Sequence, residues 1–242
     1  HGSGNFPPET IRVMDGLKGQ LPYNSVDYSP LMRAALINLD RWVSGEAPAP
    51  DSLHPSLDKG TSVESRTLKQ KFDRIPGVDS PPAVTRAMNL DFGPEVAQGR
   101  TLNLPPEHGD EYPALVSDVD ADGNDLAGIR LPDVAVPLAT VTGWNLRHPD
   151  TGGSGQTHKT MGSTVPFAFT KQERQDTSDP RPSVEERYAS KDDYLDRVEG
   201  VARDLVSEGY LLDEDVPRVG QMAGERYDLL ESQVIQTQPA GD

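Results

Sequence analysis

The sequence contains no cysteine among its 242 residues. A chain without thiols has no disulfide framework, no thiolate nucleophile and no cysteine-based zinc site. Cysteine usage therefore leaves the compartment open, and a secreted or periplasmic parent protein is compatible with the sequence. The length suffices for one large domain or two small ones with a real core.

Apolar and basic residues are both scarce. Hydrophobic residues make up 34% of the chain and aromatic residues 6%, and no apolar run reaches the roughly 18 residues of a membrane span. The first twenty residues lack the pattern of a signal peptide. Lys and Arg number 23 against 39 Asp and Glu, and the resulting net charge of -16 repels phosphate backbones and anionic lipids. We expect a soluble chain whose partners include neither nucleic acid nor membrane.

Motifs for phosphate binding and for serine hydrolysis are missing as well. Neither G-x-G-x-x-G nor G-x-x-x-x-G-K-[ST] occurs, so nothing supports a nucleotide site and we expect no cofactor. A serine hydrolase carries its nucleophile on a strained turn, usually G-x-S-x-G, where only small flanking residues fit. Ser3, Ser154 and Ser163 lie nearest to glycines, and each fails this pattern. The chain has no nucleophile elbow of its own.

One acidic loop resembles an EF-hand calcium site. Asp118, Asp120 and Asp122 occupy loop positions 1, 3 and 5, and Gly123 occupies position 6. Position 12 must supply a bidentate carboxylate, but Ile129 stands there. We interpret the loop as a turn; a calcium-binding module is the weaker alternative and predicts a melting temperature that depends on Ca²⁺.

The five histidines form no HExxH motif and no other close pair of metal ligands. Four lie beside glycine or proline in predicted loops, where a surface position is expected: His1, His54, His108 and His148. The fifth is His158. We expect no metal site.

The clearest helix covers residues 29–44. Ser29 is a candidate cap and Pro30 suits the first turn, while Gly45 and then Pro48 end the helix. One face of this helix is apolar at helical spacing and consists of Met32, Ala35, Leu36, Leu39 and Val43.

The whole sequence contains 22 Pro and 22 Gly. This composition predicts a loop-rich α+β fold. Residues 46–111 are expected to meander over a surface, because proline disfavours helix interiors and central strands. Short apolar runs after Tyr112, around an Asp-Gly turn, predict a short β-hairpin, followed by a mobile Gly- and Ser-rich link. Two helices are predicted near the end, the first ending at Gly209 and the second covering about 217–230. Two capping boxes mark helix starts: Ser183 with Glu186, and Ser190 with Asp193.

The stretch "GWNLR" places Trp144, Asn145 and Arg147 close together after an extended run. Ligand-binding pockets commonly combine aromatic side chains with a few polar groups such as an amide or a guanidinium. We therefore take these three as the candidate substrate-binding residues. A tryptophan that packs in the core beside a hydrogen-bonded amide is the structural alternative.

Several stretches resemble the C-terminal portion of the bacterial alpha/beta hydrolase domain-containing family. They occur in the family's order and include "HGSGNFPP", "SPLMRAALINLDRWVSGEAPAP", "VDADGNDLAGIRLPDVAVPLATVTGWNLR", "GSTVPFAFTKQER", "DPRPSVEERY" and "YLLDEDVPRV". The resemblance implies three segments: the end of a hydrolase core over 1–45, a Pro-rich wrap with the β-hairpin over 46–182, and a helical segment over 183–242. It also implies an esterase-like hydrolase that acts on a small ester-like substrate.

The resemblance implies a catalytic role for His1. In alpha/beta hydrolases the histidine follows the nucleophile and the acid and precedes the final helix, as His1 precedes the helix at residue 29. It would act as general base toward a serine that lies, with the acid, outside this chain. The 242 residues alone are then expected to be inactive, with the missing N-terminal hydrolase portion as their partner. The other interpretation is that His1 is the last residue of a purification tag.

A non-catalytic acidic module that binds a partner is the alternative function. An exposed patch of Met32, Leu36, Leu39 and Val43 would instead favour a truncated hydrolase, because such a patch marks a lost packing surface.

Overall fold

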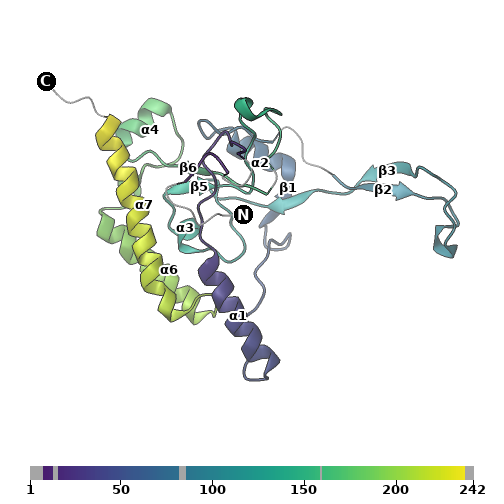
Figure 1. Ribbon diagram of the computed structural model, residues 1–242, viewed down its shortest axis with the longest axis horizontal. Helices are drawn as coiled ribbons and strands as arrows, with labels where there is room; N and C mark the ends of the chain where they lie inside the picture. The colour runs from purple at the N-terminus through teal and green to yellow at the C-terminus, as the bar shows by residue number, and fades with distance from the viewer. Residues whose placement is uncertain (1–7, 13–15, 82–85, 159, 238–242) are drawn as a thin grey trace.

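The computed structural model describes residues 8–12, 16–81, 86–158 and 160–237 (Figure 1). Helices and three small antiparallel strand pairs are joined by long irregular connections, so the predicted loop-rich α+β class is confirmed. The helices are α1 Ser29–Val43, α2 Ser65–Phe72, α3 Pro132–Ala135, α4 Lys171–Thr177, α5 Val184–Arg187, α6 Lys191–Ser207 and α7 Val216–Thr237. The strands are β1 Ser62–Glu64, β2 Met88–Asp91, β3 Glu107–Glu111, β4 Leu115–Ser117, β5 Ala139–Val141 and β6 Thr164–Pro166, paired β1–β4, β2–β3 and β5–β6. Short 3₁₀ helices cover Val96–Gln98, Pro149–Thr151 and Asp213–Asp215.

The C-terminal helices begin and end at the predicted capping residues. Ser190 Oγ accepts the backbone N–H of Asp193 at 3.1 Å, which fixes the first turn of α6. Glu186 accepts the backbone N–H of Ser183 at 3.0 Å at the start of α5. Helix α6 ends at Ser207, and Gly209 follows it with a left-handed φ of +82°, as expected of the glycine that was predicted to terminate this helix. The last helix, α7, is longer than the predicted 217–230.

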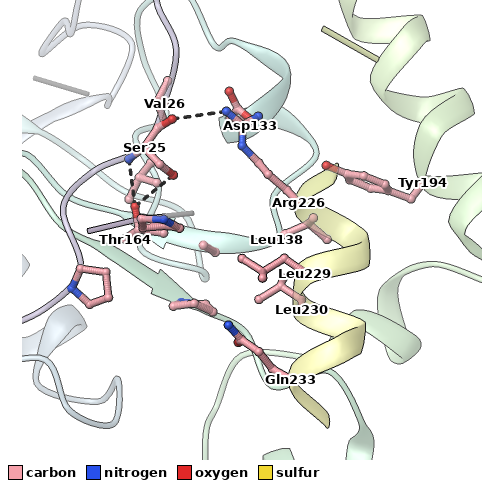
Figure 2. A pocket seen from close by; sticks show the side chains of 15 residues that line it. Ser25, Val26, Asp133, Leu138, Thr164, Tyr194, Arg226, Leu229, Leu230 and Gln233 are labelled. Carbon is pink, nitrogen blue, oxygen red and sulfur yellow. Dashed lines mark hydrogen bonds and ion pairs between the residues drawn. The ribbon is translucent and has the colours of Figure 1, made fainter. Parts of the chain in front are cut away.

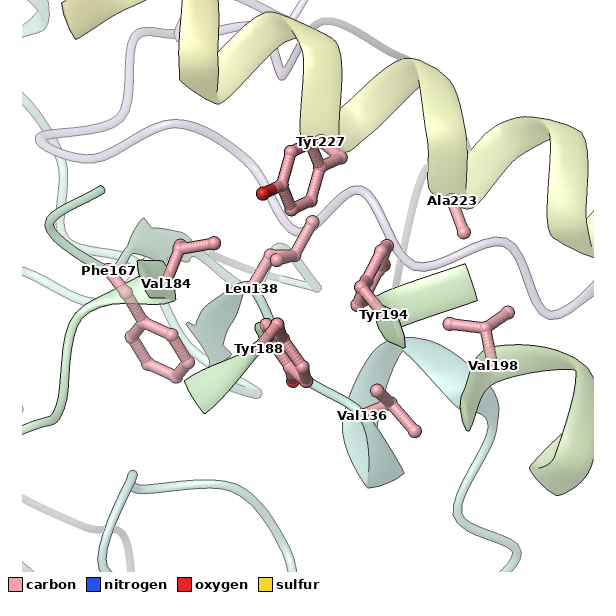
Figure 3. Packing of buried hydrophobic residues seen from close by; sticks show 9 residues of the cluster. All are labelled: Val136, Leu138, Phe167, Val184, Tyr188, Tyr194, Val198, Ala223 and Tyr227. Carbon is pink, nitrogen blue, oxygen red and sulfur yellow. The ribbon is translucent and has the colours of Figure 1, made fainter. Parts of the chain in front are cut away.

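Helices α6 and α7 lie side by side and cover one side of the β5–β6 pair (Figure 1). Their apolar stripes meet in the main core, where Tyr194 stacks on Tyr227 and contacts Tyr188 edge to face (Figure 3). The cluster consists of Val136, Leu138, Phe167, Val184, Tyr188, Tyr194, Val198, Ala223 and Tyr227. Residues from the middle and the end of the sequence therefore share one core.

The Pro-rich residues 46–111 contain more regular structure than the expected meander. Helix α2 places Phe72 in a second core with Ile75 and Val165. Strands β2 and β3 form a two-stranded arm that projects away from the body (Figure 1). Every residue of both strands is exposed. Because neither strand has a buried face, the alternation of apolar and polar residues that marks a half-buried strand is not required of them, and the strands were not predicted.

The acidic loop is a turn, as interpreted. Gly123 adopts a φ of +82° and donates its N–H to the carbonyl of Asp120 at 3.1 Å. The predicted hairpin, however, is closed by a single bridge between Val119 and Asp125. Strand β4 pairs with the distant β1 instead.

Helix α1 begins at the predicted residue and ends at Val43, one residue before the predicted end, but Ser29 does not cap it. The N-cap is Tyr28, and Ser29 donates its backbone N–H to Oδ1 of Asp27 at 2.9 Å. The predicted apolar face points away from the body: Leu36 is 62% and Val43 74% exposed. Exposed large side chains on α1 are Met32, Leu36, Ile37, Leu39, Trp42 and Val43.

The link after His148 is anchored more firmly than predicted. Leu146 forms an isolated β-bridge with Thr157, and His158 and Ser163 are buried.

No helix in the described part of the chain is long and apolar enough to span a bilayer.

Candidate functional site

A cavity of about 220 Å³ lies between the N-terminal segment, the β5–β6 pair and α7 (Figure 2). Its walls are mostly apolar, and six polar side chains also line it. The lining residues are Pro8, Pro22, Ser25, Val26, Asp133, Leu138, Ala139, Val141, Thr164, Pro166, Tyr194, Arg226, Leu229, Leu230 and Gln233.

The alternation of side chains along the two strands forms one wall. Ala139 and Val141 of β5 line the cavity, whereas Thr140, between them, is buried on the opposite face, where its Oγ1 accepts from Arg181 at 2.8 Å. On β6, Thr164 and Pro166 line the cavity in the same way. The cavity is therefore a consequence of strand register.

Helix α7 supplies the facing wall. Arg226, Leu229, Leu230 and Gln233 recur at helical spacing and form one stripe along it (Figure 2). Gln233 of α7 and Pro166 of β6 both line the cavity and are exposed, so part of the lining is in contact with solvent.

An ion pair between Asp133 of α3 and Arg226 of α7 lies at the polar end of the cavity (Figure 2). Arg226 Nη2 also donates to the backbone oxygen of Ser25 at 3.3 Å, which ties the N-terminal segment to α7. Burial raises the pKa of Asp133, and the charge of Arg226 opposes this shift. Among the described residues that line the cavity, these two are the charged side chains, one of each sign.

Three residues with hydroxyl groups, Ser25, Thr164 and Tyr194, also line the cavity. Ser25 Oγ lies 3.5 Å from Thr164 Oγ1, at the limit of hydrogen-bond distance, and Thr164 in turn donates to the carbonyl of Tyr23 at 3.0 Å. Tyr194 is only 2% exposed, and its ring belongs to the main core. Burial raises the pKa of Tyr194, so its hydroxyl stays protonated at every physiological pH.

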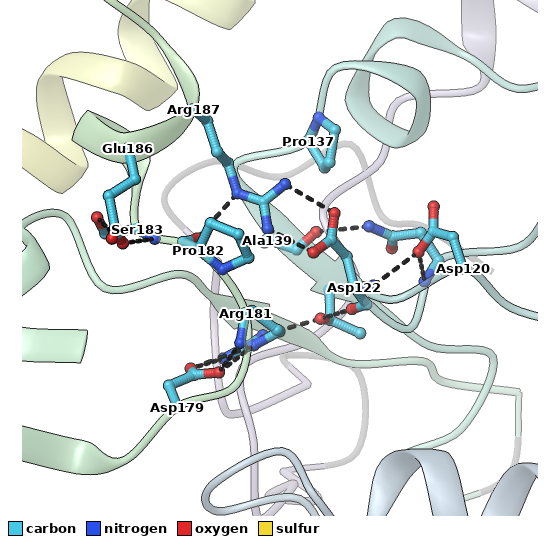
Figure 4. A network of polar contacts seen from close by, with 12 residues as sticks. Asp120, Asp122, Pro137, Ala139, Asp179, Arg181, Pro182, Ser183, Glu186 and Arg187 are labelled. Atoms are coloured by element: carbon cyan, nitrogen blue, oxygen red, sulfur yellow. Dashed lines mark hydrogen bonds and ion pairs between the residues drawn. The ribbon is translucent and has the colours of Figure 1, made fainter. Parts of the chain in front are cut away.

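A dense polar network lies on the other face of β5 (Figure 4). Arg181, 3% exposed, binds Asp179 through Nε at 2.9 Å and Nη2 at 2.6 Å. Arg187 forms a forked pair with Asp122, and Arg130 pairs with Asp120 at 2.8 Å. The carboxylates of the acidic loop are thus engaged by cations, and the network has a structural role.

The three predicted substrate-binding residues lie outside this cavity. Trp144 packs edge to face on Phe72, with ring centroids 4.5 Å apart. Asn145 is 1% exposed, and its amide exchanges two hydrogen bonds with the backbone of Leu21. Arg147 donates to the carbonyl of Thr151 at 3.2 Å. These contacts are those of the structural alternative, a packing tryptophan beside a hydrogen-bonded amide.

The histidines are scattered. His1 lies outside the described residues. His54 and His108 are exposed, and Nδ1 of His148 lies 3.1 Å from Oδ2 of Asp150 at the surface. Nε2 of the buried His158 lies 3.2 Å from the hydroxyl of Tyr23.

Of the serines near glycine, Ser3 lies outside the described residues, and the printed side-chain contact of Ser163 is with a hydroxyl. Ser163 is buried, and its Oγ lies 2.7 Å from Oγ1 of Thr142. Within the described ranges, no group of three His, Cys, Asp or Glu side chains is arranged to hold a metal ion.

Sequence reasoning missed Asp133, Arg226 and Ser25 as cavity residues. A weak signal existed in α7, where Arg226 falls on the same helical face as Leu229 and Leu230. A charged residue on an apolar face usually has a buried partner. The partner, Asp133, is 93 positions away, and no pattern in the sequence indicates that distance.

A family model described as an alpha/beta hydrolase domain matches residues 5–221. No curated protein and no solved structure matches the chain.

Proposed function

The chain belongs to the alpha/beta hydrolase domain family, and we propose that it serves the hydrolysis of an ester or related acyl bond as the C-terminal part of a Ser-His-acid hydrolase. The nucleophile and the acid come from outside these 242 residues. The substrate is a small ester-like molecule.

The observation that carries this proposal is the exposed apolar face of α1. Met32, Leu36 and Leu39 are each more than half exposed, although large apolar side chains on one helical face normally pack against another layer. In alpha/beta folds that layer is a parallel sheet covered by helices. The face of α1 is suited to such a sheet, and its exposure favours a hydrolase part over a self-contained binding module.

His1 is the proposed general base and then general acid. An imidazole with a pKa near neutrality can take the proton of a serine hydroxyl and return it to the leaving group. The serine and the orienting carboxylate would reach His1 only when the hydrolase core is present.

Substrate contact through "GWNLR" is proposed for Trp144 and Arg147, which keep some exposed surface, with Asn145 as the buried support between them. Because Asn145 holds Leu21 through its amide, its replacement would act on the position of its neighbours.

Hydrolysis of p-nitrophenyl acetate tests the proposal. We expect no turnover above buffer by the 242-residue chain, and turnover by the longer protein that its reading frame encodes. In the longer protein His1→Ala should lower kcat by about 10³-fold or more, because the residues of a triad act as a unit. His54→Ala, which removes an exposed histidine, is the matched control and should leave kcat unchanged.

Three outcomes would contradict the proposal. The chain alone could turn over ester in a way that depends on His1, or the longer protein could keep its activity after His1→Ala. Hydrolysis by neither protein would favour the non-catalytic acidic module.

A further inference from the structure

We propose that the cavity between β5–β6 and α7 binds a small uncharged molecule with an apolar body and one carbonyl or hydroxyl oxygen, which accepts a hydrogen bond from Tyr194. This is a binding site within the chain itself, and it does not depend on the proposed hydrolysis.

The hydroxyl of Tyr194 carries the argument. Tyr194 is 2% exposed and lines the cavity, and Figure 2 shows its hydroxyl end directed toward the Asp133–Arg226 pair. Within the described part of the chain, no side chain or carbonyl accepts a hydrogen bond from this hydroxyl. The oxygen of Tyr194 is not among the fully buried polar atoms that lack a partner, so it is accessible from the cavity that the residue lines. An oxygen of a ligand in the cavity can therefore accept the proton of this hydroxyl.

A second donor converges on the same space. Ser25, 6% exposed, contacts Thr164 Oγ1 only at 3.5 Å, and Thr164 already donates its own proton to Tyr23. The hydroxyl of Ser25 can therefore turn to a better acceptor in the cavity. Two hydroxyl donors facing an apolar wall of Leu138, Leu229 and Leu230 fit an oxygen at one end of an apolar molecule.

The charges select a neutral ligand. Arg226, the one cation among the described lining residues, is paired with Asp133 and also holds the backbone of Ser25. An anion would meet the carboxylate of Asp133, and a cation would meet Arg226, so either would enter a desolvated site with an unbalanced charge.

The volume limits the size. An apolar cavity of roughly 150 Å³ holds one benzene molecule, and this cavity measures about 220 Å³. A single ring with a short substituent, or an aliphatic body of similar volume, therefore fits.

Three probes of matched size test the proposal on the 242-residue chain: acetophenone, ethylbenzene and benzoate. Binding is followed by ligand-observed NMR titration and by the rise of the melting temperature. We expect acetophenone to bind more tightly than ethylbenzene, and benzoate to bind least. In Tyr194→Phe the affinity for acetophenone should fall roughly two- to tenfold, the usual worth of one neutral hydrogen bond. The affinity for ethylbenzene should stay the same or rise.

Two further variants locate the site. Ala139→Leu fills the cavity and should abolish binding of all probes, whereas Ala35→Leu, at an exposed position of α1, should leave binding unchanged. Ser25→Ala should weaken acetophenone and spare ethylbenzene. The melting curve of each variant shows that it is folded.

The proposal is overturned if no probe binds, in which case the hydroxyls bind water only. It is also overturned if Ala139→Leu binds as the parent does, or if Tyr194→Phe changes acetophenone and ethylbenzene alike.

Discussion

Arg181 contacts several segments of the molecule. Its guanidinium binds Asp179, Oγ1 of Thr140 and the carbonyls of Val165 and Pro166, with distances between 2.6 and 3.3 Å. It also lies over the ring of Phe167, 5.0 Å from the centroid. One buried cation thus joins both strands of the β5–β6 pair to the start of the C-terminal helices.

Arg181→Met should destabilise the chain by about 3–5 kcal/mol, because it leaves the carboxylate of Asp179 buried without its cation. The free energy of unfolding in urea measures the effect. The control is Arg203→Met, which breaks a surface pair with Glu199 and should cost at most about 1 kcal/mol. Equal losses in the two variants would contradict a structural role for the buried pair.

The same pair predicts a dependence on pH. Burial raises the pKa of Asp179, but the hydrogen bonds and charge of Arg181 outweigh it and hold the pKa below its ordinary value. A carboxyl whose pKa is lowered by folding contributes stability above its unfolded pKa of about 3.9 and loses it as the pH falls through the folded value. In Arg181→Met, burial raises the pKa of this carboxyl without the opposing cation, so the difference in stability between the parent chain and the variant should begin to shrink above about pH 4 and continue to shrink as the pH falls to the lowered pKa of the parent.

At the level of secondary structure, the helices with side-chain caps were the predictable elements. The bounds of α6 depend on Ser190 at one end and Gly209 at the other, two residues whose local conformational preferences are strong. The start of α1 was less predictable, because Asp27 competes for the backbone N–H of Ser29.

Ser190→Ala should destabilise the chain by about 1 kcal/mol, because the backbone N–H of Asp193 loses its acceptor at the start of α6. Thermal or urea unfolding measures the change. Ser207→Ala, in the last turn of the same helix, removes an exposed hydroxyl that bonds only to the carbonyl of Asp204. We expect that control to change stability by less than about 0.5 kcal/mol; a larger effect at Ser207 than at Ser190 would show that the cap is not what fixes the helix.

The pairings between strands could not be read from the sequence. Strand β1 pairs with β4 and β5 pairs with β6, and each strand is three residues long. Three residues are too few for a period of two to stand out from a Pro-rich background. The cavity follows from these pairings, so its location was equally hidden, whereas the buried stripe from Tyr194 to Leu205 on α6 was visible as a helical repeat.

The C-terminal helices of the molecule are well packed, whereas the apolar face of α1 is exposed. Helices α6 and α7 bury their apolar stripes in the main core, while α1 and the β2–β3 arm extend from the body on other sides (Figure 1). A helix gains most of its stability from packing its apolar face. The exposed face of α1 is thus the feature of the whole molecule on which the proposed covering layer depends.

The double substitution Leu36→Lys with Leu39→Lys should change the free energy of unfolding of the 242-residue chain by less than about 1 kcal/mol. Both side chains are more than half exposed, and lysine and leucine have similar helix propensities. Leu205→Lys on α6 is the contrasting variant, because Leu205 is 6% exposed and a lysine there would bury a charge. We expect Leu205→Lys to cost several kcal/mol in the same urea titration.

In a longer protein that supplies the proposed hydrolase core, the same double substitution should behave differently. If a sheet covers α1 there, two lysines would be forced into an apolar interface, and the loss should rise to several kcal/mol, comparable to that of Leu205→Lys. The comparison of the two proteins therefore tests the covering layer directly and without an enzyme assay. An equally small loss in both would mean that α1 stays exposed in the longer protein, and the apolar face would then have to be explained by another partner.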